Sequence, residues 1–263
     1  MISIDKFSYI SKLKQTAPVK KLIFTLMSLG VCLWADSVIV SVLVILTMGW
    51  YTVVKGGTPL AVFIKMLLIP FSFLIIGVIT IGINISSDKN VFLFSLHCFG
   101  TYFGVSQTSI LIAVHLFFKA LASVSCLYFL SLSTPVVDIM SVLRKIMVPK
   151  LIVELMGLIY RSIFVLLETA DTMFTAQNSR LGYSDLKSGY RSLAALASTL
   201  FIRAYKKSDQ LYIALESRGY DGEINVLEEQ IETHWTEFIT PVSINLFLIF
   251  VTLFLRRYEG GLL

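Results

Sequence analysis

Long apolar runs alternate with short polar breaks over most of the 263 residues of the chain. A bilayer has a hydrocarbon core of roughly 30 Å, which about 20 apolar residues in a helix can cross. The runs approach this length, so the pattern predicts about five membrane-spanning helices. Their expected limits are residues 22–35, 38–54, 60–85, 109–132 and 241–255. Pro70 falls inside the third run, where a proline can kink the helix.

Two further apolar stretches are not predicted to cross the bilayer. Residues 91–105 are interrupted by Gly100 and Gly104, and we expect an interfacial or re-entrant segment there. Residues 151–167 are apolar enough to cross, but three charged residues lie seven apart on one helical face. These are Glu154, Arg161 and Glu168. The pattern favours a helix that lies along the membrane or other helices. The alternative is a true span with an internal ion pair.

Lysine and arginine placement predicts the orientation, because these residues collect on the cytoplasmic side of membrane proteins. The lysines before the first run are Lys6, Lys12, Lys14, Lys20 and Lys21. They place the N-terminus inside. The turn at Asp36 carries no positive charge, so it suits the outside. Lys55 suits the inside, and after four spans the basic residues 135–236 are again cytoplasmic. A fifth span would place the C-terminus outside, although Arg256 and Arg257 disagree with that.

Composition supports a membrane protein and weakens other classes. The chain is 56% hydrophobic and 15% charged, which is too little charge for the surface of a soluble domain of this length. The net charge of +5 is explained by the cytoplasmic loops, so no nucleic-acid partner is expected. The polar, basic first residues carry no cleavable signal, and the first apolar run is expected to be retained. The three cysteines, Cys32, Cys98 and Cys126, are expected to be small buried side chains rather than a disulfide or a metal site.

These observations predict an all-α integral membrane protein with about five transmembrane helices and a cytoplasmic helical coupling domain. The expected domains are residues 1–134 for the first four spans, 135–236 for the cytoplasmic domain and 237–263 for the last span. Residues 192–217 of the cytoplasmic domain show apolar side chains at three- and four-residue spacing, which predicts a helix that continues until Gly219.

Two arginine motifs in the cytoplasmic domain resemble each other. Each reads Ala-x-x-Ser-Arg, then Gly-Tyr and then Asp, and the first copy has one extra residue before its glycine and another before its aspartate. The candidate site residues are Ala176, Ser179, Arg180 and Gly182 in the first motif and Ala214, Ser217, Arg218 and Gly219 in the second.

Each motif falls where a helix is expected to stop. A glycine after the last turn can adopt the left-handed conformation, and an arginine there is favoured by the helix dipole. Small residues before the arginine would let another surface approach closely. We therefore expect two helix ends that each present one guanidinium to a carboxylate of a partner. In the alternative interpretation Arg180 and Arg218 are ordinary solvated cap residues, and Tyr183 and Tyr220 are interfacial anchors.

Residues 176–183, together with residues 200–203 and 216–222, resemble the transmembrane T component of energy-coupling factor transporters, and the cobalt-type branch, CbiQ, above all. The similarity extends over nearly the whole chain and is strongest over residues 148–222. It departs from the plain Ala-Arg-Gly motif at Ser179 and Ser217, which replace alanine, and at Leu181, which replaces glycine.

The resemblance implies a scaffold in the cell membrane of a prokaryote that is not itself an enzyme. Two cytoplasmic ABC-type ATPase subunits would bind Arg180 and Arg218, and a substrate-binding integral membrane subunit would be the second kind of partner. No catalytic residue, metal ligand or cofactor is implied for this chain, since ATP and Mg²⁺ would bind the ATPases. The cargo is expected to be Co²⁺, with nickel or a vitamin as alternatives that the binding subunit would decide.

Two other classes of function remain open on sequence grounds. Ionisable residues at membrane depth, namely Lys65, His115 and Lys119, would suit a channel or secondary transporter that acts alone, although structural roles are expected for them. A membrane enzyme finds less support, because no His-Glu-x-x-His, Gly-x-Ser-x-Gly or Walker phosphate loop is present. His97 and Cys98 are too few ligands for a metal site.

Overall fold

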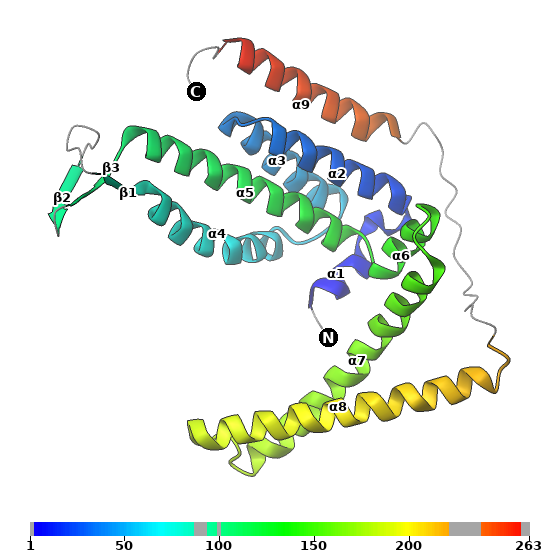
Figure 1. Cartoon of the computed structure of the whole chain (residues 1–263). Helices are drawn as coiled ribbons and strands as arrows, with labels where there is room; N and C mark the ends of the chain where they lie inside the picture. The colour runs from blue at the N-terminus through cyan, green and yellow to red at the C-terminus, as the bar shows by residue number, and fades with distance from the viewer. Residues whose placement is uncertain (1–2, 87–93, 99–100, 221–237, 259–263) are drawn as a thin grey trace. The chain divides into compact units, whose positions relative to one another are not determined.

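The computed structural model describes residues 3–86, 94–98, 101–220 and 238–258, and its chain divides into two compact units. The bundle unit comprises Ile2–Ile139 and Gln230–Leu263, and the hairpin unit comprises Met140–Glu229. Helix α6, Val136–Lys145, runs across the boundary in the sequence. Figure 1 shows the elements in chain order from blue to red.

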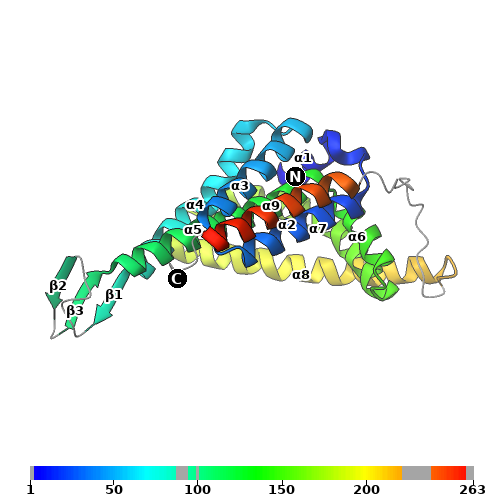
Figure 2. The same ribbon diagram turned by 90° about the horizontal axis from the view of Figure 1, so that it is seen from above.

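The bundle unit contains the long apolar helices. Its first half consists of α1 (Ser3–Ile10), a 3-10 turn η1 (Lys12–Gln15), α2 (Pro18–Trp34), α3 (Val38–Trp50), a π-helical turn η2 (Tyr51–Lys55) and α4 (Leu60–Gly82). Its second half consists of α5 (Gln107–Ser133) and α9 (Ile239–Tyr258). Helices α2, α5 and α9 lie side by side in both views (Figures 1 and 2), so the last helix of the chain returns to pack beside the first long one.

Within the part of the chain that the structure describes, four helical segments are long and apolar enough to cross a membrane. They are Val38–Lys55, Leu60–Gly82, Gln107–Ser133 and Ile239–Arg257, and each coincides with a predicted span. The first predicted span corresponds to α2, whose 17 residues make it slightly shorter than those four. Pro70 lies inside α4, as expected. The chain is therefore a multi-pass membrane protein.

The apolar residues 91–105 form β-strands where they are described, a structure that the sequence analysis did not predict, and an interfacial or re-entrant position for them stays a prediction. Three antiparallel strands form one sheet in the order β1–β3–β2. They are β1 (Ile83–Ser86), β2 (Phe94–Cys98) and β3 (Thr101–Val105), and Figure 2 shows them beyond the ends of α4 and α5. Apolar and polar residues alternate along β2, which is the period of a strand. Pairing of β1 with β3 also explains why α4 stops at Gly82 rather than at residue 85.

The core of the bundle unit lies between α2, α3, α5 and α9. Phe24 packs edge-on against Phe129 with ring centroids 5.6 Å apart, and Tyr51 stacks on the same cluster. Cys32 and Cys126 are buried free thiols within this core, so the prediction for these two cysteines is confirmed. The side chain of Cys98 lies outside the described residues.

Two buried polar contacts join helices of this core. The Ser28 hydroxyl of α2 donates to Asn245 Oδ1 of α9 at 3.0 Å, and Asn245 Nδ2 donates to the Pro241 carbonyl at 2.8 Å. The Lys21 ammonium donates to the carbonyls of Leu13 and Ser133 at 3.1 and 2.9 Å. Side-chain hydrogen bonds between helices replace the water that a bilayer cannot supply.

We expect Ser28→Ala to lower the thermal unfolding midpoint of the purified chain in detergent, because Asn245 Oδ1 would be left buried without its donor. The free energy of unfolding should fall by roughly 1 kcal/mol. Ser243→Ala is the matched control, since Ser243 is exposed on α9, the helix that carries Asn245, and its hydroxyl donates to the Thr240 carbonyl of that same helix. Equal midpoints for the two variants would contradict a bridging role for Ser28.

Candidate functional site

The hairpin unit consists mainly of two long helices joined by residues 180–185. These helices are α7 (Lys150–Ser179) and α8 (Leu186–Glu216), and none of the side chains of α8 is buried. The first arginine motif lies immediately before α8 and the second immediately after it. At 1.5 Å per residue the 31 residues of α8 span about 45 Å. The structure thus places the two motifs at opposite ends of one helix rather than together.

The first motif closes α7 with a left-handed residue. Leu181 has φ of 57°, its N–H donates to the Asn178 carbonyl at 3.0 Å, and the Gly182 N–H donates to the Gln177 carbonyl at 2.9 Å. This pair of bonds is the Schellman arrangement, which satisfies carbonyls that the end of the helix leaves unpaired. Arg180 is the residue immediately before the left-handed position.

The second motif closes α8 in the same way. Gly219 has φ of 75°, its N–H donates to the Glu216 carbonyl at 3.0 Å, and the Tyr220 N–H donates to the Leu215 carbonyl at 3.0 Å. Arg218 again immediately precedes the left-handed residue. The expectation that both motifs end helices is confirmed, and the two arginines occupy equivalent positions.

The predicted role of Gly182 as the left-handed residue is wrong. Leu181 takes that position, and it corresponds to Gly219 of the second motif. A leucine with positive φ costs about 1–2 kcal/mol relative to an ordinary conformation, so neighbouring contacts must hold it. Gly182 is required for space instead: a Cβ there would lie 2.7 Å from Ser192 Oγ and 2.9 Å from the Gln177 carbonyl oxygen.

A set of hydrogen bonds around Gln177 holds this turn against α8. Gln177 Nε2 donates to the Ser192 carbonyl at 3.1 Å, and the Tyr183 hydroxyl donates to Gln177 Oε1 at 2.8 Å. Ser192 Oγ donates to the Gly182 carbonyl at 2.8 Å, and the Tyr183 ring packs 4.8 Å from that of Phe174. Sequence reasoning missed Gln177 and Ser192, because the spacing between them reflects the turn geometry and not a repeat. Tyr183 is a structural part of the turn.

Asp185 begins α8. Its carboxylate accepts the Ser188 backbone N–H at 3.1 Å, which is an N-cap bond. Hydrogen bonds from the side chain and the backbone of Ser188 lower the pKa of the Asp185 carboxyl below its usual range. The helix therefore starts at Leu186, six residues before the predicted residue 192. The Asp-x-x-Ser spacing was the sequence signal for this earlier start.

The second motif is connected to the start of α7. The Tyr220 hydroxyl donates to Glu154 Oε2 at 3.4 Å, and Glu154 is only 9% exposed. Arg161 and Glu168 are exposed whereas Glu154 is buried. The three residues of the predicted polar stripe on α7 therefore have different surroundings. Helix α7 is not among the helices of the described chain that meet the length and hydropathy of a span. That residues 151–167 do not cross the membrane stays a prediction.

Both guanidinium groups are exposed at their helix ends. Neither guanidinium forms a hydrogen bond or ion pair with the residues that the structure describes. The hydroxyls of Ser179 and Ser217 donate to carbonyls of their own helices at Thr175 and Ala214. Ala176 and Ala214 are exposed as well. Each tip presents a planar cation that is suited to a carboxylate.

The ionisable residues of the bundle unit have ordinary structural explanations. Lys119 of α5 forms an ion pair with Asp36 in the turn between α2 and α3. Lys65 is exposed and His115 is half-buried. Within the described residues, no group of three or more His, Cys, Asp and Glu side chains is placed to hold a metal ion. The described residues of the bundle unit therefore give no strong indication of a polar pathway.

Apolar helices of membrane length and an exposed helical hairpin define the class, a multi-pass α-helical membrane protein. Residues 10–230 match the family model for the cobalt transport protein CbiQ, and the chain belongs to this family. The resemblance found from the arginine motifs is thereby confirmed.

Individual relatives agree with the family. The chain is 30% identical over 228 residues to the cobalt transport protein CbiQ of Salmonella typhimurium, which covers 86% of this chain and 100% of that one. It is 37% identical over 152 residues to a fused cobalt transport protein CbiMQ of Methanocorpusculum labreanum, covering 58% and 24%. It is 29% identical over 129 residues to the energy-coupling factor transporter transmembrane protein EcfT of Lactococcus lactis, covering 45% and 48%.

We expect Gly182→Ala to destabilise the turn between α7 and α8 by about 1–3 kcal/mol, because the new methyl group would overlap Ser192 Oγ and the Gln177 carbonyl. Hydrogen–deuterium exchange of the amides around residues 178–192 should accelerate. Gly189→Ala is the control. Its Cβ would lie 3.8 Å from Tyr183, an ordinary contact, and alanine favours the helix by up to about 1 kcal/mol. Equal exchange in both variants would refute the packing role of Gly182.

Proposed function

We propose that this chain is the energy-coupling subunit of an ATP-driven importer and that Arg180 and Arg218 each bind one cytoplasmic ATPase subunit. The observation that carries the proposal is the pair of equivalent, exposed arginines at the two ends of α8. A separation of about 45 Å allows each arginine to engage a different protein. A guanidinium can form two parallel hydrogen bonds with a carboxylate, which fixes orientation as well as contact.

The exposed surface of α8 supports the same proposal. Large apolar side chains are open to solvent along the helix, among them Leu186, Tyr190, Phe201, Tyr205 and Tyr212. Exposed aromatic and apolar groups of this kind mark protein interfaces. ATP-driven approach of two ATPases would displace the gripped ends of the hairpin unit, and a pair of long helices transmits such a displacement over tens of ångströms. ATP and Mg²⁺ would bind the ATPases and not this chain.

The second partner in the proposal is a substrate-binding integral membrane subunit, and the cargo is Co²⁺. The family description and the fused relative, in which two named transport proteins share one chain, support this assignment. Nickel or a vitamin is the alternative cargo. The identity of the membrane subunit that co-purifies with this chain decides between them.

We expect Arg180→Ala and Arg218→Ala each to weaken binding of the ATPases roughly tenfold or more, because each removes a charge-assisted hydrogen bond of about 1.5–3 kcal/mol. The double variant should be worse and should uncouple ATP hydrolysis from uptake. Arg→Lys should be intermediate, since lysine keeps the charge but loses the planar fork. Co-purification of the ATPases and metal uptake in whole cells are the measurements.

Arg203→Ala is the matched control, because Arg203 is exposed near the middle of α8, away from both ends. It removes the same charge and should leave binding and uptake unchanged. Wild-type binding and uptake in the Arg180→Ala/Arg218→Ala variant would reject the coupling role. Uptake by the purified chain in liposomes without any ATPase would reject it in favour of a stand-alone transporter.

The proposed function requires the hairpin unit to face the cytoplasm. A Ser184→Cys variant in a Cys98→Ser background should therefore react with a membrane-impermeant thiol reagent in inside-out vesicles and not in intact cells. Ser184 is exposed in the turn between α7 and α8, and the other two cysteines are buried. Labelling in intact cells would show that residues 151–167 cross the bilayer and would overturn the predicted orientation.

A further inference from the structure

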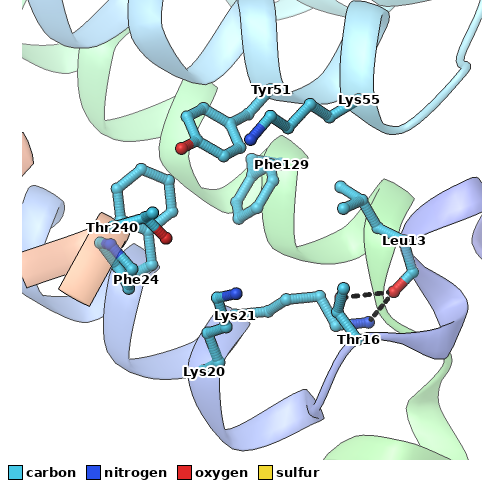
Figure 3. Close-up of a pocket in the computed structure, with 10 residues that line it drawn as sticks. Leu13, Thr16, Lys20, Lys21, Phe24, Tyr51, Lys55, Phe129 and Thr240 are labelled. Atoms are coloured by element: carbon cyan, nitrogen blue, oxygen red, sulfur yellow. Dashed lines mark hydrogen bonds between the residues drawn. The ribbon is translucent and has the colours of Figure 1, made fainter. Parts of the chain in front are cut away.

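A basic cavity lies within the bundle unit. It has a volume of about 170 Å³ and is enclosed by residues of η1, α2, η2, α5 and the start of α9. Figure 3 shows the side chains around it, with Lys20, Lys21 and Lys55 among them. Among the described residues that line the cavity none is acidic. A water molecule in the liquid occupies about 30 Å³, so the cavity can hold a phosphate-sized group but not a much larger ligand.

Lys21 is the most deeply buried cation of this cavity. It is 3% exposed, and its ammonium donates to the carbonyls of Leu13 and Ser133. A lysine ammonium has three N–H donors. The two carbonyls are the acceptors that it contacts in the described chain, which leaves one donor on the cavity wall. The carboxylate that acts electrostatically on Lys21 is that of Asp138.

The opposite wall combines a second cation with aromatic rings. Lys55 Nζ lies 4.9 Å from the ring centroid of Tyr51 and 5.4 Å from that of Trp50. Phe24 and Phe129 form the apolar floor beside Tyr51. Thr16 and Thr240 also line the cavity, and the Thr16 hydroxyl donates to the Leu13 carbonyl at 2.6 Å. The cavity thus offers cations to an anion and rings to its organic part.

The helix ends around the cavity lie at one face of the bundle. Helices α2 and α9 begin there, whereas η2 and α5 end there. The lysine distribution predicts that this face is cytoplasmic, which is the side where anionic lipids attract basic residues. A lipid phosphate at this depth would remain attached to acyl chains that run along the apolar helices.

We propose that this cavity binds the phosphate headgroup of an anionic phospholipid, with Lys20, Lys21 and Lys55 as its cationic ligands. The bound phosphate accepts the third Lys21 N–H and lies beside the two neighbouring ammonium groups. The glycerol part of the lipid lies against the aromatic floor. The lipid thereby ties together helices that are far apart in the sequence.

The test compares binding of phosphatidylglycerol and phosphatidylcholine with the same acyl chains to the delipidated full chain in detergent, by native mass spectrometry and by thermal unfolding. Phosphatidylglycerol should bind more tightly and raise the unfolding midpoint. Lys55→Gln should weaken its binding about fivefold and Lys20→Gln/Lys55→Gln about thirtyfold. Lys21 is left unchanged, because its contacts with Leu13 and Ser133 hold the fold.

Lys6→Gln/Lys65→Gln is the control, since both lysines are exposed outside the cavity and the loss of charge is the same. This control should retain wild-type affinity. Equal loss of binding in the two double variants, or no loss in either, would overturn the proposal. Full displacement of the lipid by millimolar inorganic phosphate would also overturn it, because the cavity would then be a site for the free anion.

Discussion

A helix leaves its last four backbone carbonyls without partners inside the helix, and the way they are satisfied decides where this chain presents its positive charges. Helices α7 and α8 use left-handed residues, Leu181 and Gly219, whose geometry closes the carbonyls with backbone N–H groups. The arginine before each left-handed residue is then free to project. At the end of α5 a side chain does the same work, since the Lys21 ammonium binds the Ser133 carbonyl. Cations accordingly gather at helix C-terminal ends, where the helix dipole also favours them.

The two helix ends that carry Arg180 and Arg218 share this geometry, but different contacts hold them in place. The first is fixed by the Gln177 hydrogen bonds and by the close approach of Gly182 to α8, so its left-handed leucine is held in place by its surroundings. The second has a glycine that needs no such support and is connected to α7 through Tyr220 and Glu154. The first tip is therefore a turn braced by side-chain hydrogen bonds, whereas the second is the end of a long helix with a side-chain contact to α7. The two arginines are equivalent in backbone position and unequal in how firmly they are placed.

Sequence patterns predicted most of the membrane helices and the position of both arginines, because hydropathy and cap residues are local signals. The limits of α5 and α9 lie within a few residues of the expected ones. The exchange of roles between Leu181 and Gly182 could not be predicted, since it depends on Ser192 packing against the turn from another helix. The three strands were not predicted from the sequence for a different reason. Residues 91–105 are apolar overall, and the two-residue alternation in β2 was outweighed by that apolar character.

The coupling proposal and the lipid proposal place different demands on the two units. Force applied at Arg180 and Arg218 can reach a membrane partner only if the transmembrane helices keep their own arrangement, because a soft bundle would absorb the displacement. The Ser28–Asn245 bond and the Lys21 contacts fasten α2 to α9 and to α5. A phosphate bound between Lys21 and Lys55 would add a link from α2 to η2, where rings rather than hydrogen bonds now make the contact. The lipid would then stiffen the bundle at the ends of α2, η2, α5 and α9 that surround the cavity.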